Sequence, residues 1–498
     1  MTDYHSSSSP ERTNFQNLQS VAALDRFLKR KRTVDETFEQ FERELNVHMR
    51  RMECELKEIE LARYDVNEPI VSVEGKAFRL CLEKEPKMYL SSSGPITVRR
   101  NLFRPSGGGK AICAVDLRGG VIGSCTPLLA RQISFLVGLL PSEQAASVFR
   151  ELGIEGPSAS TCDRMPKFIN PVWEKNREAW ETALRAKETV PADATVLATS
   201  LDGVLVPDKE AQKEAKAARE EAEKEGLRKT SGPAGYREVG CGTVTLYAPP
   251  ENVDSDDPEE RAPIRLSTVR YARAPEYKKK TLTEQLDAEV DAIVAVRPDL
   301  TLVALADGAE ENWRYFEGEK WEEAIKIVDH GHASQHLKAA LATYYRDTID
   351  GRAEYERLRL ILRDKPGGID EVIGELNRLD RKLYERNHPR RRKLLRKERK
   401  YFKNQRERMD YAYYQELGLP IGSGVVEAAC KTLATQRLKQ SGMNWGDGKQ
   451  PILTIRSLQQ SDRWENGWAL IAGAFRKEIC RVSKRRHLQC VQPIRMAA

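Results

Sequence analysis

The stretch Val196-Leu197-Ala198-Thr199-Ser200-Leu201-Asp202-Gly203 is a short apolar run that ends in a carboxylate and a glycine. A second stretch, Leu300-Thr301-Leu302-Val303-Ala304-Leu305-Ala306, leads in the same way into Asp307-Gly308. Runs of this kind are typical of strands that are buried inside an α/β protein. Each Asp-Gly pair also has a plain alternative, because Asp-Gly between apolar runs indicates a hairpin or an ordinary strand-end turn.

The region around these two runs predicts a five-stranded sheet. We expect strands over residues 195–206, 237–247, 264–271, 300–306 and 324–328, and a helix over about 282–296 between the third and the fourth. Three strands, a helix, a strand, a short helical piece and a fifth strand is the order of a ribonuclease H-like α/β core. That core carries acids on its first strand, at the end of its fourth strand and on a later helix, which are the places of Asp202, Asp307 and Glu427.

The third acid belongs to the stretch Pro420-Ile421-Gly422-Ser423-Gly424-Val425-Val426-Glu427-Ala428-Ala429-Cys430-Lys431. A Gly/Ser loop precedes a helical run here. Ser423 is a suitable N-cap, and Glu427 falls in the first turn, where the positive end of a helix favours an acid. Three carboxylates placed in this way are suited to two divalent metal ions. Hard oxygen ligands favour Mg²⁺, with Mn²⁺ as a substitute.

Six short blocks extend this pattern over about residues 195–460. They are Ser200-Leu-Asp-Gly-Val204, Arg237-Glu-Val-Gly240, Leu305-Ala-Asp-Gly-Ala309, Asp329-His-Gly-His332, the 420–431 stretch, and Gln436-Arg-Leu-Lys-Gln-Ser-Gly-Met-Asn-Trp445. In this order they resemble the DDE transposases of bacterial insertion sequences and, more distantly, the Mutator-like transposases. The resemblance implies that Asp202, Asp307 and Glu427 form the catalytic, metal-binding triad. It also implies that Asp329 and His332 correspond to the Asp-x-x-His signature of Mutator-like enzymes.

Asp329 and His332 belong to the one histidine cluster of the chain, together with His330 and His336. Three interpretations stay open. The spacing matches no common zinc ligand set, although a zinc site is conceivable. Asp329 and His332 can instead orient metal ligands or contact a DNA phosphate, or Asp329 can simply satisfy the start of a helix. Paired cysteines, which relatives often carry in the N-terminal strand region, are replaced by Phe103-Arg-Pro-Ser-Gly-Gly-Gly, so a zinc knuckle is not expected there.

The segment 386–408 is densely basic and lies in a long stretch that shows helical patterning and no strand signal. We expect it to be part of an all-α insertion and to hold DNA through the phosphate backbone, with Arg390, Arg391, Arg392, Lys393, Arg396 and Lys397 as the contacting residues. The alternative is a solvated helix face, the usual role of charge runs. Arg437 and Lys439, which follow the Glu427 helix, are expected to line the DNA path, whereas Trp445 fits either that path or the core.

The N-terminal third predicts helices and a DNA-reading element. Residues 38–59 show the period of an amphipathic helix, and residues 70–120 predict short strands. Helical segments over 142–152 and 158–165, separated by a turn at 153–156, have the pattern of a helix-turn-helix. In that interpretation Ser160, Thr161 and Arg164 meet base edges; the alternative is a packed helical hairpin.

Length and composition suggest several domains. The chain has 498 residues, 32% of them charged, and a net charge of +7. Nine scattered cysteines without a Cys-x-x-Cys pair argue against a disulfide scaffold, and the absence of a long apolar run or signal peptide leads us to expect a cytoplasmic protein without membrane contact. The expected parts are a polar tail and amphipathic helix (1–65), a mainly helical DNA-binding region (66–190), the first part of the ribonuclease H-like core (191–345), the all-α insertion (346–418), and the completion of the core with a C-terminal tail (419–498).

The function expected from the residues and the resemblance together is that of a transposase. It would bind the terminal inverted repeats of its own insertion sequence and carry out metal-dependent DNA cleavage and strand transfer into target DNA. Two ends must be brought together, so a homo-oligomer is expected. The alternatives are a nuclease or resolvase on the same fold that cleaves without joining, and a DNA-binding relative whose catalytic core is inactive.

Overall fold

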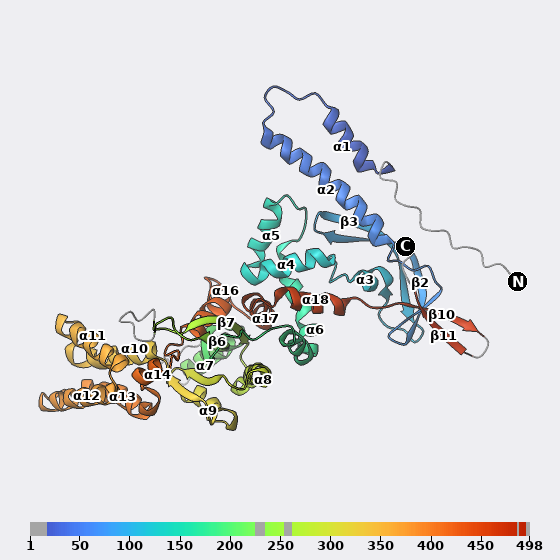
Figure 1. Ribbon diagram of the computed structural model, residues 1–498. Coiled ribbons are helices and arrows are strands. Elements are labelled where there is room, and N and C mark those ends of the chain that lie inside the picture. Colours follow the sequence, from blue (N-terminus) through green and yellow to red (C-terminus); the bar gives the residue numbers. More distant parts are fainter. Residues whose placement is uncertain (1–16, 225–234, 253–260, 486–487, 495–498) are drawn as a thin grey trace. The chain divides into compact units, whose positions relative to one another are not determined.

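The computed structural model describes residues 17–224, 235–252, 261–485 and 488–494, with the backbone alone for 483–492 (Figure 1). It is a mixed α/β structure with two sheets. Its contacts group the chain into two compact units, which we call the N-terminal unit (Met1–Trp180 with Trp464–Ala498) and the central unit (Glu181–Arg463). This grouping differs from the ranges expected from the sequence, because the residues after Arg463 join the N-terminal unit and not the core.

The central unit contains a five-stranded sheet in the order β7-β6-β5-β8-β9. The strands are β5 (Val196–Pro207), β6 (Tyr236–Ala248), β7 (Ile264–Arg273), β8 (Thr301–Ala306) and β9 (Ile325–Val328). Strands β5, β6 and β7 are antiparallel neighbours, whereas β8 and β9 run parallel to β5. All five expected strands are confirmed, and so is the expected helix, α8 (Lys280–Val296), between β7 and β8.

One detail of β5 differs from the expectation for an Asp-Gly pair. Asp202 and Gly203 do not turn: Asp202 pairs with Cys241, Gly203 with Gly240, and the ladder continues to Pro207 opposite Tyr236. The hairpin alternative is therefore wrong, because the backbone groups of both residues stay in the ladder with β6.

Helices cover both faces of this sheet. Helix α8 packs against β6 and β7, and α15 (Gly424–Ala429), a π-helical segment (Cys430–Thr435) and α17 (Lys449–Gln460) pack against the strands as well. The buried core joins apolar residues of the sheet, such as Leu197 and Val303, to the helix residues Leu286 and Leu337. Shorter elements complete the unit: α7 (Lys209–Lys224), α9 (Glu310–Phe316) and α16 (Gln436–Leu438).

The expected all-α insertion is also confirmed. It follows β9 as α10 (His330–Tyr345), α11 (Ile349–Asp364), α12 (Gly368–Glu385), α13 (Pro389–Asn404) and α14 (Tyr411–Glu416), and no strand interrupts it (Figure 1). Leu379, Leu395 and Phe402 are fully buried in the same core cluster as the sheet residues. The insertion is therefore packed onto the sheet through one continuous apolar core.

The N-terminal unit is less helical than expected. Helices α1 (Gln19–Lys29) and α2 (Phe38–Ala62) form a hairpin, and a six-stranded sheet has the order β11-β10-β1-β2-β3-β4. Its strands are β1 (Ile70–Val73), β2 (Lys76–Ser91), β3 (Gly94–Pro105), β4 (Ile112–Cys113), β10 (Cys480–Arg485) and β11 (Leu488–Pro493). The remaining helices are α3 (Ala114–Gly119), α4 (Pro127–Leu139), α5 (Ser142–Glu151), α6 (Ala159–Arg185) and α18 (Trp464–Phe475).

The helix expected over 158–165 is only the beginning of α6, which has 27 residues and continues through Pro166 and Pro171. A short recognition helix is therefore not what the structure contains, although the turn between α5 and α6 is confirmed. None of the helices in the described ranges is both long enough and apolar enough to cross a membrane.

Candidate active site

Three aspartates follow directly after the paired residues at which the parallel ladders of β5, β8 and β9 end. In the register of the sheet Leu201 of β5 is opposite Ala306 of β8, and Ala306 is opposite Val328 of β9. The next residues are Asp202, Asp307 and Asp329. Because the carboxyl ends of parallel strands meet at one edge of a sheet, Asp307 and Asp329 lie in register beside Asp202, although β5 itself continues in its ladder with β6.

Asp202 projects from the interior of β5 and is held by two donors. Its Oδ1 accepts a hydrogen bond from the backbone N–H of Gly203 at 2.7 Å, and its Oδ2 accepts one from the Cys430 thiol at 3.5 Å. Cys430 lies three residues after Glu427, so both project from nearly the same side of the helix. Asp202 therefore faces the helix that carries the third expected acid.

Asp307 is held from the other direction by the helix that follows it. Its Oδ1 accepts hydrogen bonds from the backbone N–H of Ala309 at 3.1 Å and from Nδ2 of Asn312 at 2.9 Å. The indole of Trp313 donates to the backbone oxygen of Asp307 at 2.8 Å. Among the described residues no donor reaches Oδ2, so this oxygen is left as the available ligand atom.

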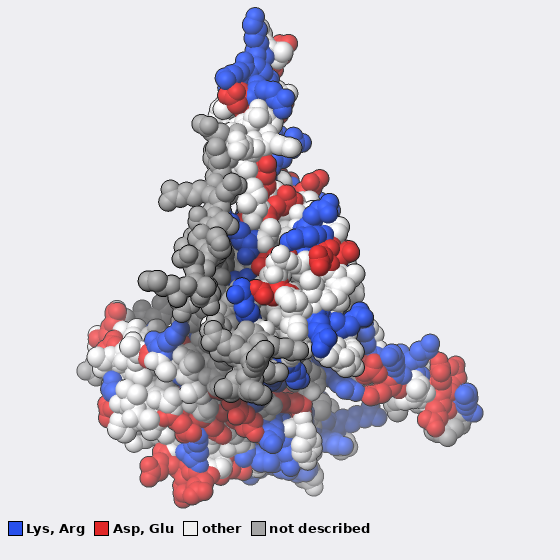
Figure 2. All heavy atoms as spheres, turned by 90° about the vertical axis from the view of Figure 1, so that its right-hand side faces the viewer, with Lys and Arg blue, Asp and Glu red and all other residues white. Residues whose placement is uncertain are grey.

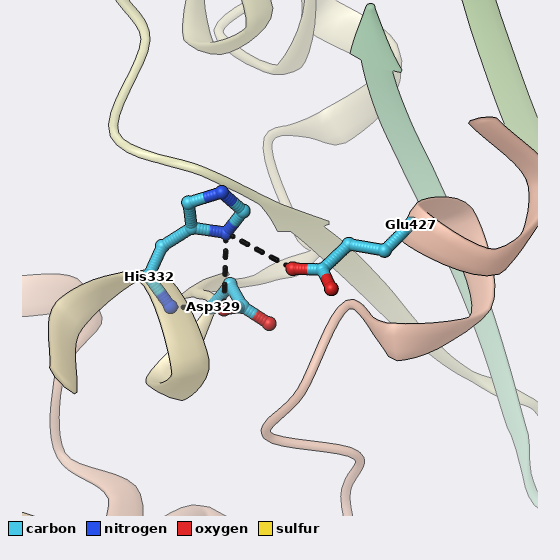
Figure 3. A group of neighbouring side chains, drawn as sticks. All are labelled: Asp329, His332 and Glu427. Carbon is cyan, nitrogen blue, oxygen red and sulfur yellow. Dashed lines mark hydrogen bonds and ion pairs between the residues drawn. The ribbon is translucent and has the colours of Figure 1, made fainter. Parts of the chain in front are cut away.

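Asp329, His332 and Glu427 form the tightest group of the site (Figure 3). Nδ1 of His332 lies 3.2 Å from Oδ1 of Asp329 and 3.4 Å from Oε1 of Glu427. Asp329 caps α10 by accepting the backbone N–H of His332, and its other oxygen accepts the backbone N–H of Ser423. The expected helix start at Asp329 is thus confirmed, and it ties α10 to the loop before α15. Ser423 acts through its backbone there, and its side chain makes no cap hydrogen bond.

Burial and mutual repulsion shift the pKa values of these acids. Burial raises the pKa of Asp202, and the charge of Asp307 adds to the rise. Burial also raises the pKa of Glu427, with further contributions from Asp329 and Asp202. The hydrogen bond to Asp329 raises the pKa of His332 to about 9. For Asp329 burial acts upward, but the hydrogen bonds from His332 and Ser423 outweigh it and lower the pKa. The site therefore gathers negative charge that one imidazolium offsets in part.

The donor set fits a hard divalent cation. In the described part of the chain no Lys or Arg forms an ion pair with Asp202, Asp307 or Glu427, and carboxylate oxygens are the ligands that Mg²⁺ prefers. Only Asp329, His332 and Glu427 offer ligand atoms that all lie within 4.8 Å of one another among the described residues. Asp202 and Asp307 stay outside that radius, although the charge of Asp307 contributes to the raised pKa of Asp202 and the charge of Asp202 to the raised pKa of Glu427. Asp329, His332 and Glu427 are thus the residues close enough to share one ion, and His332 would have to give up the proton at Nδ1 to act as a ligand there.

The expected DNA-contacting residues of α13 divide into two groups. Arg391 donates to the backbone oxygens of Thr343 and Tyr344, at the end of α10. Arg392 and Arg396 form ion pairs with the buried Asp380 at 2.9 and 3.3 Å, and Arg399 forms a third at 3.2 Å. The other exposed cations of the same helix are Arg390, Lys393, Lys397, Lys400 and Lys403, and Arg396 is exposed as well in spite of its ion pair.

The remaining expected contacts differ in the same way. Lys439 is exposed, but Arg437 is 3% exposed, and its guanidinium lies 5.2 Å from the centre of the Trp445 ring. The expectation that Arg437 lines an open DNA path is corrected, because its side chain is packed in the interior. In the N-terminal unit Ser160 and Arg164 are exposed, and Thr161 is half-buried against Ser158.

Cations also gather in the N-terminal unit. The turn between α1 and α2, at the top of Figure 2, carries Arg30, Lys31 and Arg32, but Arg30 is paired with Glu36 and Glu44. On the rest of the face drawn in Figure 2 both signs of charge are interspersed. The exposed charged residues of α13 are all basic, so α13 is the more uniformly positive of these two surfaces.

Three residues near the site were not singled out from the sequence. Asn312 and Cys430 bind Asp307 and Asp202, and the ring of Tyr401 lies against Gly308. The spacing of Cys430 from Glu427 was a usable signal, since residues three apart share a helix face. No such signal existed for Tyr401, because it comes from the insertion.

Comparisons with known proteins do not assign the chain to a family: no model of a known family matches the chain, and no curated protein matches it.

Proposed function

We propose that this chain is a DDE transposase with a ribonuclease H-like core. The observation that carries the proposal is a five-stranded sheet in the expected order, in which Asp202 of a strand interior lies in register beside the strand end that carries Asp307 and contacts the helix of Glu427 through Cys430. Neighbouring acids that perturb one another without a Lys or Arg partner are candidates for function. Their chemistry supports metal-dependent phosphodiester cleavage and strand transfer.

Each residue has a definite task in this proposal. Asp202, Asp307 and Glu427 would hold two Mg²⁺ or Mn²⁺ ions, which when bound make a water or a 3′-hydroxyl a better nucleophile and steady the leaving oxygen. His332 holds a proton at Nδ1 between Asp329 and Glu427 and so keeps the α15 carboxylate turned toward the strand ends. Asp329 fixes His332 and the loop at Ser423 at the same time.

The exposed charges support DNA as the substrate. Arg390, Lys393, Lys397 and Lys400 are suited to phosphate contacts that set the register of a duplex without reading its sequence. Sequence reading at the terminal repeats is assigned to the N-terminal unit, where Ser160 and Arg164 are exposed in the first turns of α6. Two ends have to be joined to one target, so the active form is a homo-oligomer.

The first prediction tests the three acids. Asp202→Asn, Asp307→Asn and Glu427→Gln should each abolish cleavage of a duplex that carries the element's end, because residues that act as one unit lose nearly all activity together. Binding of the same duplex should persist. The measurement is cleavage and strand joining with Mg²⁺ on labelled DNA, beside binding by gel shift. Asp299→Asn, at an exposed ion pair with Arg297, is the matched control and should cleave normally.

Near-normal cleavage by any one of the three variants would remove that residue from the set. Cleavage without joining by the unaltered protein would favour the nuclease or resolvase alternative. DNA binding without any cleavage would favour the inactive relative.

A further inference from the structure

A short chain of polar contacts reaches Asp307 from the sheet side. Asn312 lies on α9, is 3% exposed, and donates from Nδ2 to Oδ1 of Asp307 at 2.9 Å. Its own Oδ1 accepts a hydrogen bond from Nζ of Lys279 at 3.2 Å. An ammonium can only donate and an ionised carboxylate can only accept, so the orientation of the Asn312 amide is determined by its two partners.

Both the side chain and the backbone of Lys279 are constrained. Its Nζ forms an ion pair with Oε1 of Glu238 at 2.7 Å, and its side chain is only 12% exposed. Its backbone has φ = 53°, and that of the preceding Lys278 has φ = 54°, both in the left-handed region that non-glycine residues rarely adopt. Consecutive residues in this conformation persist only where their surroundings require it, and such positions cluster at functional sites.

Glu238 brings this chain of contacts back to β5. A Cβ added at Gly203 would lie 1.8 Å from Oε1 of Glu238, so the carboxylate occupies the space above the residue that follows Asp202. Glu238, Lys279 and Asn312 therefore connect the neighbour of one expected metal ligand to the carboxylate of another. A cavity of about 230 Å³, also lined by Arg237 and Arg273, borders Glu238 and Lys279, so a substituted side chain at position 279 has room.

We infer that Asn312 and Lys279 are positioning residues that orient the Asp307 carboxylate for a divalent cation. The inference rests on the proposed function of the same site. Two donors occupy Oδ1 of Asp307, which leaves Oδ2 as the ligand atom. The ammonium of Lys279 polarises the Asn312 amide and strengthens its hydrogen bond to the carboxylate. Partners of this kind fix ligand orientation at metal sites.

The test compares three variants of the full-length chain. Lys279→Met removes the ammonium and keeps the length, and Asn312→Leu removes both hydrogen bonds at similar volume. Lys278→Met is the matched control, since it removes the same charge from an exposed neighbour with the same backbone conformation. Three quantities are measured: the dissociation constant for Mn²⁺ by calorimetry with and without duplex DNA, the Mg²⁺ concentration for half-maximal cleavage, and the melting temperature.

The expected result is a weaker metal site in a folded protein. Lys279→Met and Asn312→Leu should each raise the Mn²⁺ dissociation constant and the Mg²⁺ requirement by about 10- to 100-fold, the usual loss for residues that orient a metal ligand. The double variant should be no weaker than Asn312→Leu alone, because Lys279 acts through Asn312. Lys278→Met should bind metal as the unaltered chain does.

Other outcomes separate this inference from the proposed function. A lower melting temperature with an unchanged metal requirement would show that the contacts only stabilise the fold, and additive losses in the double variant would show that Lys279 does not act through Asn312; either overturns the inference alone. Weakened Mn²⁺ binding in the variants of a chain that never cleaves DNA would overturn the proposed function and leave the inference standing. An unaltered chain that neither binds Mn²⁺ nor cleaves DNA would overturn both.

Discussion

Gly308 follows Asp307 directly and lies against an aromatic ring of the insertion. A Cβ at this position would come to 2.1 Å from Cε2 of Tyr401. The ring is also stacked on His336, with 3.8 Å between the centroids, and His336 in turn binds Glu398 at 2.6 Å, so these contacts restrict its movement. The absence of a side chain at position 308 is therefore what lets α13 close over the turn that carries the acid.

This contact leads to a prediction at the residue scale. Gly308→Ala should destabilise the protein by about 1–3 kcal/mol, the usual cost of overpacking a well-filled site. It should also weaken cleavage, because the turn at Asp307 must shift. Stability is measured by urea unfolding followed by fluorescence. Gly374→Ala is the control, since a Cβ there meets no atom within 4 Å and alanine favours a helix. Equal stability of Gly308→Ala and the unaltered chain would contradict the contact.

At the scale of the element, α13 has two different faces. Arg392, Arg396 and Arg399 recur at helical spacing and converge on Asp380 of α12, whose side chain is 8% exposed. The hydrogen bond and charges of these arginines lower the pKa of Asp380, although burial acts in the opposite direction. Arg390, Lys393, Lys397 and Lys400 are exposed and take no part in this pairing. The basic run looks uniform in the sequence, but part of it therefore stabilises the packing of α13 against α12 through Asp380.

The two faces predict different phenotypes. Changing Arg390, Lys393, Lys397 and Lys400 to Gln should weaken binding to specific and random DNA alike. It should also reduce the slope of log affinity against log salt by up to about 4, because a protein that makes fewer phosphate contacts releases fewer counterions when it binds. Changing Arg392, Arg396 and Arg399 to Gln should instead lower the melting temperature, because Asp380 is left buried without its ion-pair partners. The measurement is a salt titration of binding with a melting curve for each protein. An unchanged slope in the first variant would mean that this face is only solvated.

At the scale of the whole molecule, the residues after Arg463 fold together with the N-terminal residues in one compact unit. Strand β10 pairs with β1, with Val71 opposite Arg481. Ile479 is 1% exposed in a cluster with Val71 and Phe103. The ring of Trp464 packs against Phe135 at 5.7 Å between the centroids. The N-terminal unit is thus built from two stretches of chain that the central unit separates.

Truncation tests this arrangement. A protein that ends at Arg463 should lose hydrogen-exchange protection in β1, β2 and α4, because their apolar partners and a neighbouring strand are gone. Protection in β5 and β8 should persist, since the central unit keeps all its strands. The measurement is hydrogen exchange read by mass spectrometry of peptides from the two units, with a protein that ends at Ile494 as the control. Equal protection of β1 in both proteins would contradict a structural role for β10 and α18.

The sequence alone determined the elements of the central unit and the order in which its acids occur. Apolar runs, the helical period and the acid at each strand end are local properties, and the adjacency of Asp202 and Asp307 follows once the strands are parallel neighbours. The insertion and the helix start at Asp329 were predictable for the same reason.

Only the tertiary structure decided which charges face inward and which residues complete the site. Three arginines of α13 form ion pairs with Asp380, and the guanidinium of Arg437 packs on the ring of Trp445. Asn312 forms hydrogen bonds with both Lys279 and Asp307. β10 likewise finds its partner in β1, about 400 residues away in the sequence by the numbering of the paired residues. The physical reason is that the burial of a polar side chain depends on a partner brought to it by the fold, and no local pattern in the chain specifies that partner.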